Sequence, residues 1–167
     1  IRERGLEGRV EIRLEDYREH HGQYDRIVSV GMFEHVGAPY HRPFFETVRE
    51  RLKDDGVAVI HTIGRRHPVP QTNPWIHRYV FPGGYIPALS EIAQAVEGAD
   101  LVPADVEVLR LHYAETLAHW SQRFGRVRHQ VAAEKGERFC RLWEFYLVVS
   151  EASFRFGALM VFQFQLS

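Results

Sequence analysis

Hydrophobic residues fall into short continuous runs separated by an amphipathic stretch in the first half of the chain. YDRIVSVGM, at residues 24–32, and VAVIHTIG, at residues 57–64, each contain the apolar run expected of a strand buried on both faces. Between them, apolar residues recur at helical spacing from Phe44 to Leu52, and Gly56 is expected to end that helix. Strand, helix and strand in this order predict a βαβ unit with parallel strands and a right-handed crossover.

Three further segments have the pattern of strands. VEIRL, at residues 10–14, alternates and is rich in β-forming residues. Residues 100–111 predict a loop that enters a strand, and LMVFQFQLS, at residues 159–167, alternates as a final strand. We expect this last strand to be antiparallel and to lie at an edge of the sheet. The predicted fold class is an α/β open sheet.

Helical and loop segments separate these strands. Residues 65–85 contain four prolines and a pair of glycines, which predicts a long ordered loop or lid. Ser90–Val96 predicts a helix. Residues 114–152 have helical character, with interruptions expected near Gly125 and Gly136.

Composition narrows the class of protein. The chain has 167 residues, of which 45% are hydrophobic and 26% charged, and this balance suits one globular domain with a sizeable core. The formal net charge of −1 gives no reason to expect a nucleic-acid partner. The single cysteine, Cys140, excludes an internal disulfide and suits a reducing compartment. No apolar run approaches the ~20 residues of a transmembrane segment.

The first residues, IRERGLEGRV, begin without Met. Ile1–Arg4 have the pattern of a last helical turn that Gly5 stops, and a domain rarely begins at the end of a helix. We therefore expect further residues upstream of Ile1.

Polar side chains follow three apolar runs where the predicted strands end. Asp16 and Tyr17 follow the first strand, Glu34 and His35 follow the second, and His61 lies near the end of the next. Ligands bind at the carboxyl ends of strands in open α/β sheets, so the pattern indicates a site there. Structural roles also stay open: Glu34 could be a surface group or helix-cap neighbour, and His61 a hydrogen-bonded core histidine.

Several common catalytic patterns are absent. The ten histidines form neither HExxH nor a Cys/His ligand spacing, so no metal site is expected. The chain has no GxSxG elbow, no GxxxxGK[ST] loop and no GxGxxG fingerprint. Cys140 lies in the helical stretch GERFCRLWEF, where packing is its expected role.

Aromatic and basic residues gather in the later part of the chain. Aromatic residues make up 13% of the sequence, and several fall in the predicted lid and helical region. They form either an aromatic core or a pocket for a long apolar substrate, in which ring faces can stabilise a transient cation. Between Ser121 and Arg141 there are six basic and two acidic residues. This stretch is either a solvated helix face or a patch for anionic lipid head groups.

Six motifs carry a resemblance to a known family. They run in family order from about residue 10 to the C-terminus: LEDYRE, YDRIVSVGMFEHVG, GVAVIHTIG, WIHRYVFPGGYIP, HYAETLAHW, and RLWEFYLVVSEASFRFG followed by VFQFQLS. The combination resembles the cyclopropane-fatty-acyl-phospholipid synthases, S-adenosylmethionine-dependent methyltransferases that include the mycolic acid cyclopropane synthases. Four of these motifs together are specific for the family, whereas each alone is weak evidence for it: FEHVG, HTIG, FPGG and HYxxTLxxW.

The resemblance implies a doubly wound, Rossmann-like class I methyltransferase sheet of seven strands whose final strand is antiparallel. Residues 1–167 would be the C-terminal part of this catalytic domain and hold its last five strands. The first two strands, which carry much of the family's cofactor site, would be missing from this chain, so we expect an incomplete core and weak cofactor binding. A lid or substrate-pocket insertion at about 65–98 and a helical region at about 114–152 complete the implied domain.

The resemblance also implies a site with two bound groups, S-adenosylmethionine and a bicarbonate ion. The catalytic residues, which also bind bicarbonate together with the Ile63 backbone, would be Glu34, His61 and Tyr113. The residues that match the family's cofactor contacts are Asp16, Tyr17, Val30, Gly31 and Met32. The substrate pocket would include Phe33, Trp75, Tyr79, Phe81 and Tyr85. His35 is given no ligand role, and orientation or capping is expected of it.

The implied reaction transfers a methylene group to the cis double bond of an unsaturated phospholipid acyl chain and forms a cyclopropane ring. Methyl transfer to an alkene leaves a carbocation, so the site needs a dry aromatic pocket and a base, which bound bicarbonate would provide. The resemblance places the protein in the cytoplasm, in peripheral contact with the inner membrane face, and homodimerisation is an expectation at the family level. Two alternatives stay open: a methyltransferase that gives a methyl-branched lipid or methylated small molecule, and an inactive fragment that serves as an interaction domain.

Overall fold

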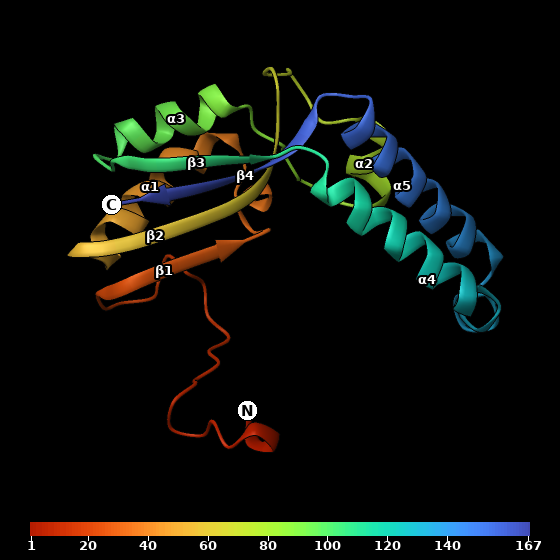
Figure 1. Cartoon of the computed structure of the whole chain (residues 1–167), viewed down its shortest axis with the longest axis horizontal. Coiled ribbons are helices and arrows are strands. Elements are labelled where there is room, and N and C mark those ends of the chain that lie inside the picture. Colours follow the sequence, from red (N-terminus) through yellow and green to blue (C-terminus); the bar gives the residue numbers. More distant parts are fainter.

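The computed structural model describes residues 1–167 as a four-stranded mixed sheet, two helices on one of its faces, and a helical hairpin beyond the strand ends (Figure 1). The strands are β1 (Tyr24–Val30), β2 (Leu52–Arg65), β3 (Pro103–Leu109) and β4 (Leu159–Leu166). The α-helices are α1 (His41–Arg51), α2 (Pro74–Tyr79), α3 (Leu89–Gly98), α4 (His112–Lys135) and α5 (Glu137–Arg155). Three short 3-10 helices are η1 (Arg2–Arg4), η2 (Phe33–His35) and η3 (Ala38–Tyr40).

The strands lie in the order β1-β2-β4-β3. β1 and β2 are parallel, with Val28 opposite Val59 and Val30 opposite His61, so the predicted parallel βαβ unit is confirmed. β4 is antiparallel to both of its neighbours, as predicted for the final strand. Its predicted place at the sheet edge is wrong, because β4 is hydrogen-bonded on both sides. Alternation shows which face each side chain points to, and it carries no information about neighbours within the sheet.

The main hydrophobic core lies between one face of the sheet and the helices α1 and α3. Ile60 of β2 and Phe164 of β4 point to this face and are almost fully buried. Phe44 of α1 and Ile92 of α3 belong to the same cluster. Both helices therefore cover the same face, and the ends of the parallel strands are free to carry a site.

α1 ends earlier than expected, and Gly56 lies inside β2 rather than at the helix end. The helix stops at Arg51, and Leu52 already has extended backbone angles (φ −86°, ψ 132°). Leu52 is buried in the core, and the next side chain forms a 2.8 Å ion pair, Lys53–Asp25, with β1. These contacts with the sheet override the helical spacing of the apolar residues.

Residues 10–14 form no strand, so the sheet has four strands in place of the expected five. Ile12 and Leu14 are exposed, and the side chains of Glu11 and Arg13 pair with each other. The segment trails away from β1 without a neighbouring strand (Figure 1). A strand needs a hydrogen-bonded partner, and β-forming composition does not replace one.

The shorter helices agree with the sequence pattern in most places. α3 contains the predicted helix Ser90–Val96, and η1 precedes Gly5, as expected for the first residues. The predicted loop of residues 65–85 also contains the short helix α2. It was not predicted, because the prolines of this segment indicate a loop. Asn73 caps this helix, because its side-chain oxygen accepts hydrogen bonds from the first backbone N–H groups of α2.

α4 and α5 form a hairpin that projects beyond the sheet (Figure 1). The predicted interruption near Gly125 is wrong, because one glycine costs about 1 kcal/mol relative to alanine, too little to break a 24-residue helix. Gly136 does separate the helices, and its φ of +84° lets the chain reverse. Arg128 of α4 joins the hairpin by an ion pair with Glu144 of α5 at 2.6 Å. No helix in the chain combines the length and the apolar character needed to cross a bilayer.

Gly64→Ala is expected to destabilise the protein, whereas Gly125→Ala is expected to stabilise it. A methyl group at position 64 would lie 2.2 Å from the ring of Phe162 and 3.2 Å from the carbonyl oxygen of Pro87. We expect the free energy of unfolding to fall by about 1–3 kcal/mol. A methyl group at position 125 meets open space inside a helix, so the same quantity should rise by about 0.5–1 kcal/mol. Urea denaturation followed by circular dichroism measures both, and an unchanged stability in Gly64→Ala would contradict this packing.

Candidate functional site

The carboxyl ends of β1 and β2 bring Glu34 against Ile63. After β1, Gly31 turns the chain with a φ of +64°, and η2 then carries Glu34 inward. The backbone N–H of Ile63 donates a 2.6 Å hydrogen bond to Oε1 of Glu34, and the backbone N–H of Tyr85 donates to its carbonyl oxygen at 2.9 Å. Glu34 is therefore fixed by β2 on one side and by the loop between α2 and α3 on the other.

The second carboxylate oxygen of Glu34 has no partner. Glu34 is only 8% exposed, and Oε2 is fully buried without a hydrogen bond. A buried, unpaired carboxylate oxygen is costly, so such an atom marks a place where a donor can bind. This oxygen accordingly suits a ligand that carries an acidic proton, as bicarbonate does.

Tyr113 lies near Glu34 at the start of α4. Its half-buried ring packs against Phe154 and Trp120, with centroid distances of 5.1 and 6.0 Å. Burial raises the pKa of the Tyr113 phenol above its ordinary value, and the charge of Glu34 raises it further. The phenol therefore keeps its proton at neutral pH and can donate a hydrogen bond to an anion.

His61 lies on the same face of β2 as Ile63, two residues earlier. Its Nδ1 is 3.4 Å from Oε1 of Gln163 on β4, and Nε2 of Gln163 donates to Glu107 of β3 at 3.3 Å. Gln163 and Glu107 were not predicted from the sequence. Polar residues on alternating strands were visible, but only the strand order reveals that these two lie next to His61.

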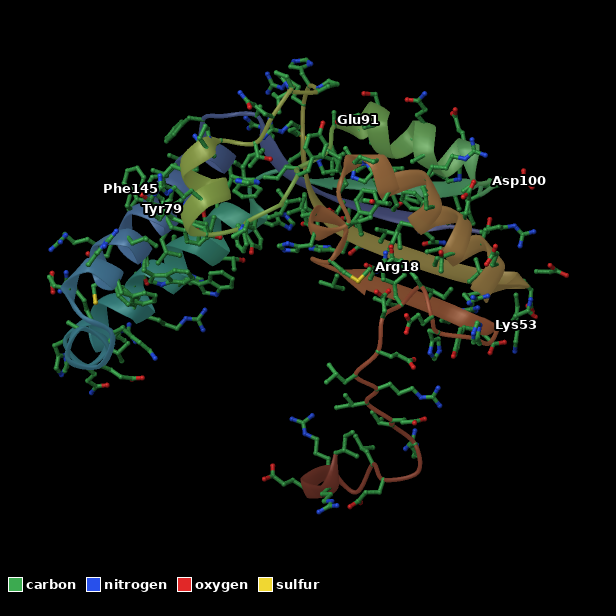
Figure 2. All side chains as sticks on the ribbon, turned by 180° about the vertical axis from the view of Figure 1, so that it is seen from behind. Arg18, Lys53, Tyr79, Glu91, Asp100 and Phe145 are labelled. Atoms are coloured by element: carbon green, nitrogen blue, oxygen red, sulfur yellow. The ribbon has the colours of Figure 1, made fainter.

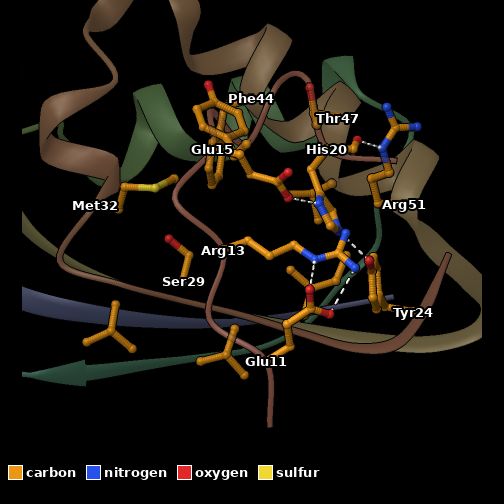
Figure 3. Close-up of a pocket in the computed structure, with 15 residues that line it drawn as sticks. Glu11, Arg13, Glu15, His20, Tyr24, Ser29, Met32, Phe44, Thr47 and Arg51 are labelled. Carbon is orange, nitrogen blue, oxygen red and sulfur yellow. Dashed lines mark hydrogen bonds and ion pairs between the residues drawn. The ribbon is translucent and has the colours of Figure 1, made fainter. Parts of the chain in front are cut away.

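Three of the five predicted cofactor residues line one cavity. A cavity of about 790 Å³ lies beside β1 and is lined by Tyr17, Val30 and Met32, together with polar residues of the first segment (Figure 3). The Ser29 hydroxyl on its wall is buried without a partner, which suits a ligand that combines an apolar body with hydrogen-bonding groups. Gly31 lies at the end of the same strand.

Asp16 points to another partner. Arg18 donates to its carboxylate from the backbone N–H at 3.0 Å and from Nε at 2.9 Å. These hydrogen bonds lower the pKa of Asp16 to about 2. Asp16 is therefore a carboxylate at neutral pH, and in this structure it pairs with Arg18 instead of lining the cavity.

The predicted substrate pocket is divided between two places. Trp75 of α2 packs against Tyr79 of the same helix and Phe145 of α5, and Phe81 contacts the ring of Tyr146. The remaining two lie elsewhere. Phe33 is fully buried in the main core, and the hydroxyl of Tyr85 donates to Glu91 at 2.6 Å.

His35 is exposed, with its ring edge against Phe81. Its side chain forms no hydrogen bond or ion pair with Glu34, and the role in orientation or capping that we expect of it stays a prediction.

Comparison with known proteins identifies close relatives. A family model described as mycolic acid cyclopropane synthetase matches residues 1–164. The cyclopropane-fatty-acyl-phospholipid synthase of Escherichia coli (strain K12) is 38% identical over 154 residues, which cover 92% of this chain and 40% of that protein. The tuberculostearic acid methyltransferase UfaA1 of Mycobacterium tuberculosis (strain ATCC 25618 / H37Rv) is 40% identical over 168 residues, which cover 97% of this chain and 39% of that protein. This chain thus spans about 40% of the length of these relatives.

A solved structure supports the same assignment of fold. The mycolic acid cyclopropane synthase CmaA1, in complex with SAH and CTAB, superposes with a TM-score of 0.83 at 29% sequence identity. The match covers 90% of this chain and 57% of that chain. The predicted class I methyltransferase fold is confirmed by this likeness.

Glu34→Ala is expected to destabilise the junction of β1, β2 and the lid. The substitution leaves the buried N–H of Ile63 without an acceptor, which should lower the free energy of unfolding by about 1–3 kcal/mol. Glu34→Gln retains an acceptor for this N–H, so its free energy of unfolding should fall by less. Urea denaturation gives the free energies, and hydrogen exchange at the Ile63 amide reports the local loss. The exposed Glu46 serves as the control, since Glu46→Ala should change stability by no more than about 1 kcal/mol.

Proposed function

The chain belongs to the mycolic acid cyclopropane synthetase family, and we propose that the protein transfers a methylene group from S-adenosylmethionine to the cis double bond of an unsaturated phospholipid acyl chain, forming a cyclopropane ring. The observation that carries the proposal is the buried carboxylate of Glu34, which Ile63 fixes and whose Oε2 is unpaired. The similarity to the Escherichia coli cyclopropane-fatty-acyl-phospholipid synthase supports the choice of substrate.

The residues that would hold S-adenosylmethionine lie at the cavity beside β1. Tyr17, Val30 and Met32 would provide its apolar walls, and Gly31 would let the backbone approach the ligand. When bound, S-adenosylmethionine supplies a methyl group activated by a positively charged sulfur. The carboxylate of Asp16 accepts hydrogen bonds from Arg18 in this structure and does not line the cavity.

Glu34, His61 and Tyr113 would hold a bicarbonate ion. Oε2 of Glu34 would accept the proton of the ion, and the protonated phenol of Tyr113 would donate to one of its oxygens. When bound, bicarbonate supplies a small, replaceable base next to the acyl chain. The backbone N–H of Ile63 is already bonded to Glu34, so we assign Ile63 to holding Glu34 instead of the ion.

Aromatic side chains of the lid would exclude water from the acyl chain. Trp75 of α2 is in edge contact with Phe145 of α5, and Phe81 is in edge contact with Tyr146. Ring faces also stabilise positive charge, which develops on the acyl chain when an alkene carbon accepts a methyl group. Loss of a proton from that methyl group and closure of the carbon–carbon bond then complete the ring.

Glu34→Gln in the full-length protein is expected to lower the rate of product formation by ~10²-fold or more, because the amide is a much weaker proton acceptor than the carboxylate. Binding of S-adenosylmethionine, measured by calorimetry, should stay largely unchanged. His61→Ala and Tyr113→Phe should also lower the rate, whereas Glu46→Gln on the exposed side of α1 should not. Wild-type turnover in Glu34→Gln would refute its role.

The same assay distinguishes the alternative products. The similarity to the tuberculostearic acid methyltransferase UfaA1 favours a methyl-branched lipid as the second candidate. Proton NMR of the extracted lipid separates the two outcomes, because a cyclopropane product lacks the alkene signal and gains signals of ring protons. A third candidate, a non-catalytic interaction domain, would form no product and would not bind S-adenosylmethionine.

We further propose that the outer surface of α2 and α5 contacts an anionic membrane. Tyr79 and Phe145 both pack against Trp75, and 43% and 51% of their surfaces are exposed (Figure 2). At the start of α5, Arg138 and Arg141 are exposed and form no ion pair, whereas Arg128 is neutralised by acidic partners. Exposed aromatic rings next to unpaired arginines suit the boundary between head groups and acyl chains.

Replacing both arginines, Arg138→Glu with Arg141→Glu, should weaken binding of the full-length protein to phosphatidylglycerol vesicles by about tenfold or more, since each basic residue near a membrane contributes about 1 kcal/mol. Sedimentation with vesicles measures this binding. The pair Arg26→Glu and Arg49→Glu makes the same change in charge on β1 and α1 and should have a smaller effect. Equal losses in the two double variants would contradict the proposed surface.

A further inference from the structure

Three polar side chains form a row across the sheet. His61 on β2 lies opposite Gln163 on β4, and Gln163 lies opposite Glu107 on β3. Directly opposite residues point to the same face of a sheet, so the row follows from the strand order. The distances are 3.4 Å from Nδ1 of His61 to Oε1 of Gln163, and 3.3 Å from Nε2 of Gln163 to Oε2 of Glu107.

The chemistry of Glu107 fixes the direction of every hydrogen bond in this row. A carboxylate can only accept, so the amide nitrogen of Gln163 must face Glu107. The amide oxygen of Gln163 then faces His61, and an amide oxygen also can only accept. Nδ1 of His61 must therefore carry a hydrogen, which leaves Nε2 as the nitrogen available to a ligand.

We propose that Gln163, held by Glu107, is a positioning residue that fixes the Nδ1-protonated tautomer of His61. The importance of this tautomer for catalysis rests on the proposed function, in which His61 contacts the bound bicarbonate. Because Glu34 accepts the single proton of the ion, Nε2 of His61 can bind an oxygen of the ion only as the donor of a protonated ring, and the hydrogen bond from Nδ1 to Gln163 sets the direction in which Nε2 points.

The tautomer of His61 can be read directly by long-range proton–nitrogen NMR on the histidine-labelled chain of 167 residues. Spectra of the neutral ring, recorded at alkaline pH, should show its hydrogen on Nδ1. The His61→Gln variant assigns the signal. A neutral His61 with its hydrogen on Nε2 would overturn the proposal.

Substitutions at Gln163 separate a specific role from a structural one. Gln163→Met keeps the size of the side chain but offers no amide, so the preference for Nδ1–H should be lost. Gln163→Glu still provides an acceptor for Nδ1–H, so this variant should retain the preference for the Nδ1–H tautomer. Gln165→Met, at the next position on the same face of β4, should leave His61 unchanged. An unchanged tautomer in Gln163→Met would overturn the proposal.

Glu107→Lys gives a more demanding test, because Glu107 is exposed and the substitution should not unfold the protein. A lysine can only donate, so the amide of Gln163 should turn its oxygen toward Lys and its nitrogen toward His61. His61 should then accept at Nδ1 and carry its hydrogen on Nε2. Persistence of the Nδ1–H form in this variant would contradict the assigned direction of the hydrogen bonds.

Turnover in the full-length protein tests the consequence for catalysis. Gln163→Met should lower kcat by about 10–100-fold with a smaller change in KM, and Gln163→Glu should recover part of the loss. Wild-type kcat in Gln163→Met would overturn the positioning role. If the spectra agree but His61→Ala keeps full activity, the proposed function fails while the tautomer assignment stands.

Discussion

The hydrogen bond from the backbone N–H of Ile63 to Glu34 holds the candidate site together. It joins the segment after β1 to β2, and the lid adds a second bond to the same residue through Tyr85. A carboxylate could not stay buried at this point without such donors. Because one oxygen is used to fix the side chain, the other remains available at a defined position near Tyr113.

Much of this arrangement was predictable from the sequence. Apolar runs identified β1 and β2, and the polar residues that follow them indicated the place of Glu34 and His61. Strand pairing was not predictable in the same way, because it depends on segments distant in the sequence. The pattern of β4 predicted its direction but not its central place, and residues 10–14 have strand composition without a partner.

The same limit explains which site residues were missed. Gln163 stands in an alternating strand and Glu107 in another, and nothing in either pattern connects them with His61. Their relation appears only after β4 is placed between β2 and β3. Conversely, the family resemblance implied that Phe33 lines the substrate pocket, yet consecutive residues of η2 can point into different surroundings, and Phe33 packs in the core.

The central place of β4 has a consequence for how the protein forms on the ribosome. β4 follows all other strands in the sequence. It lies between β2 and β3, and these two strands are joined only through it. During synthesis, β1, α1 and β2 can associate early, whereas β3 must wait for residues 159–166 to emerge. Contacts between distant segments form slowly, so the nascent chain should expose unpaired strand edges until residues 159–166 have emerged, a period in which chaperones are most useful.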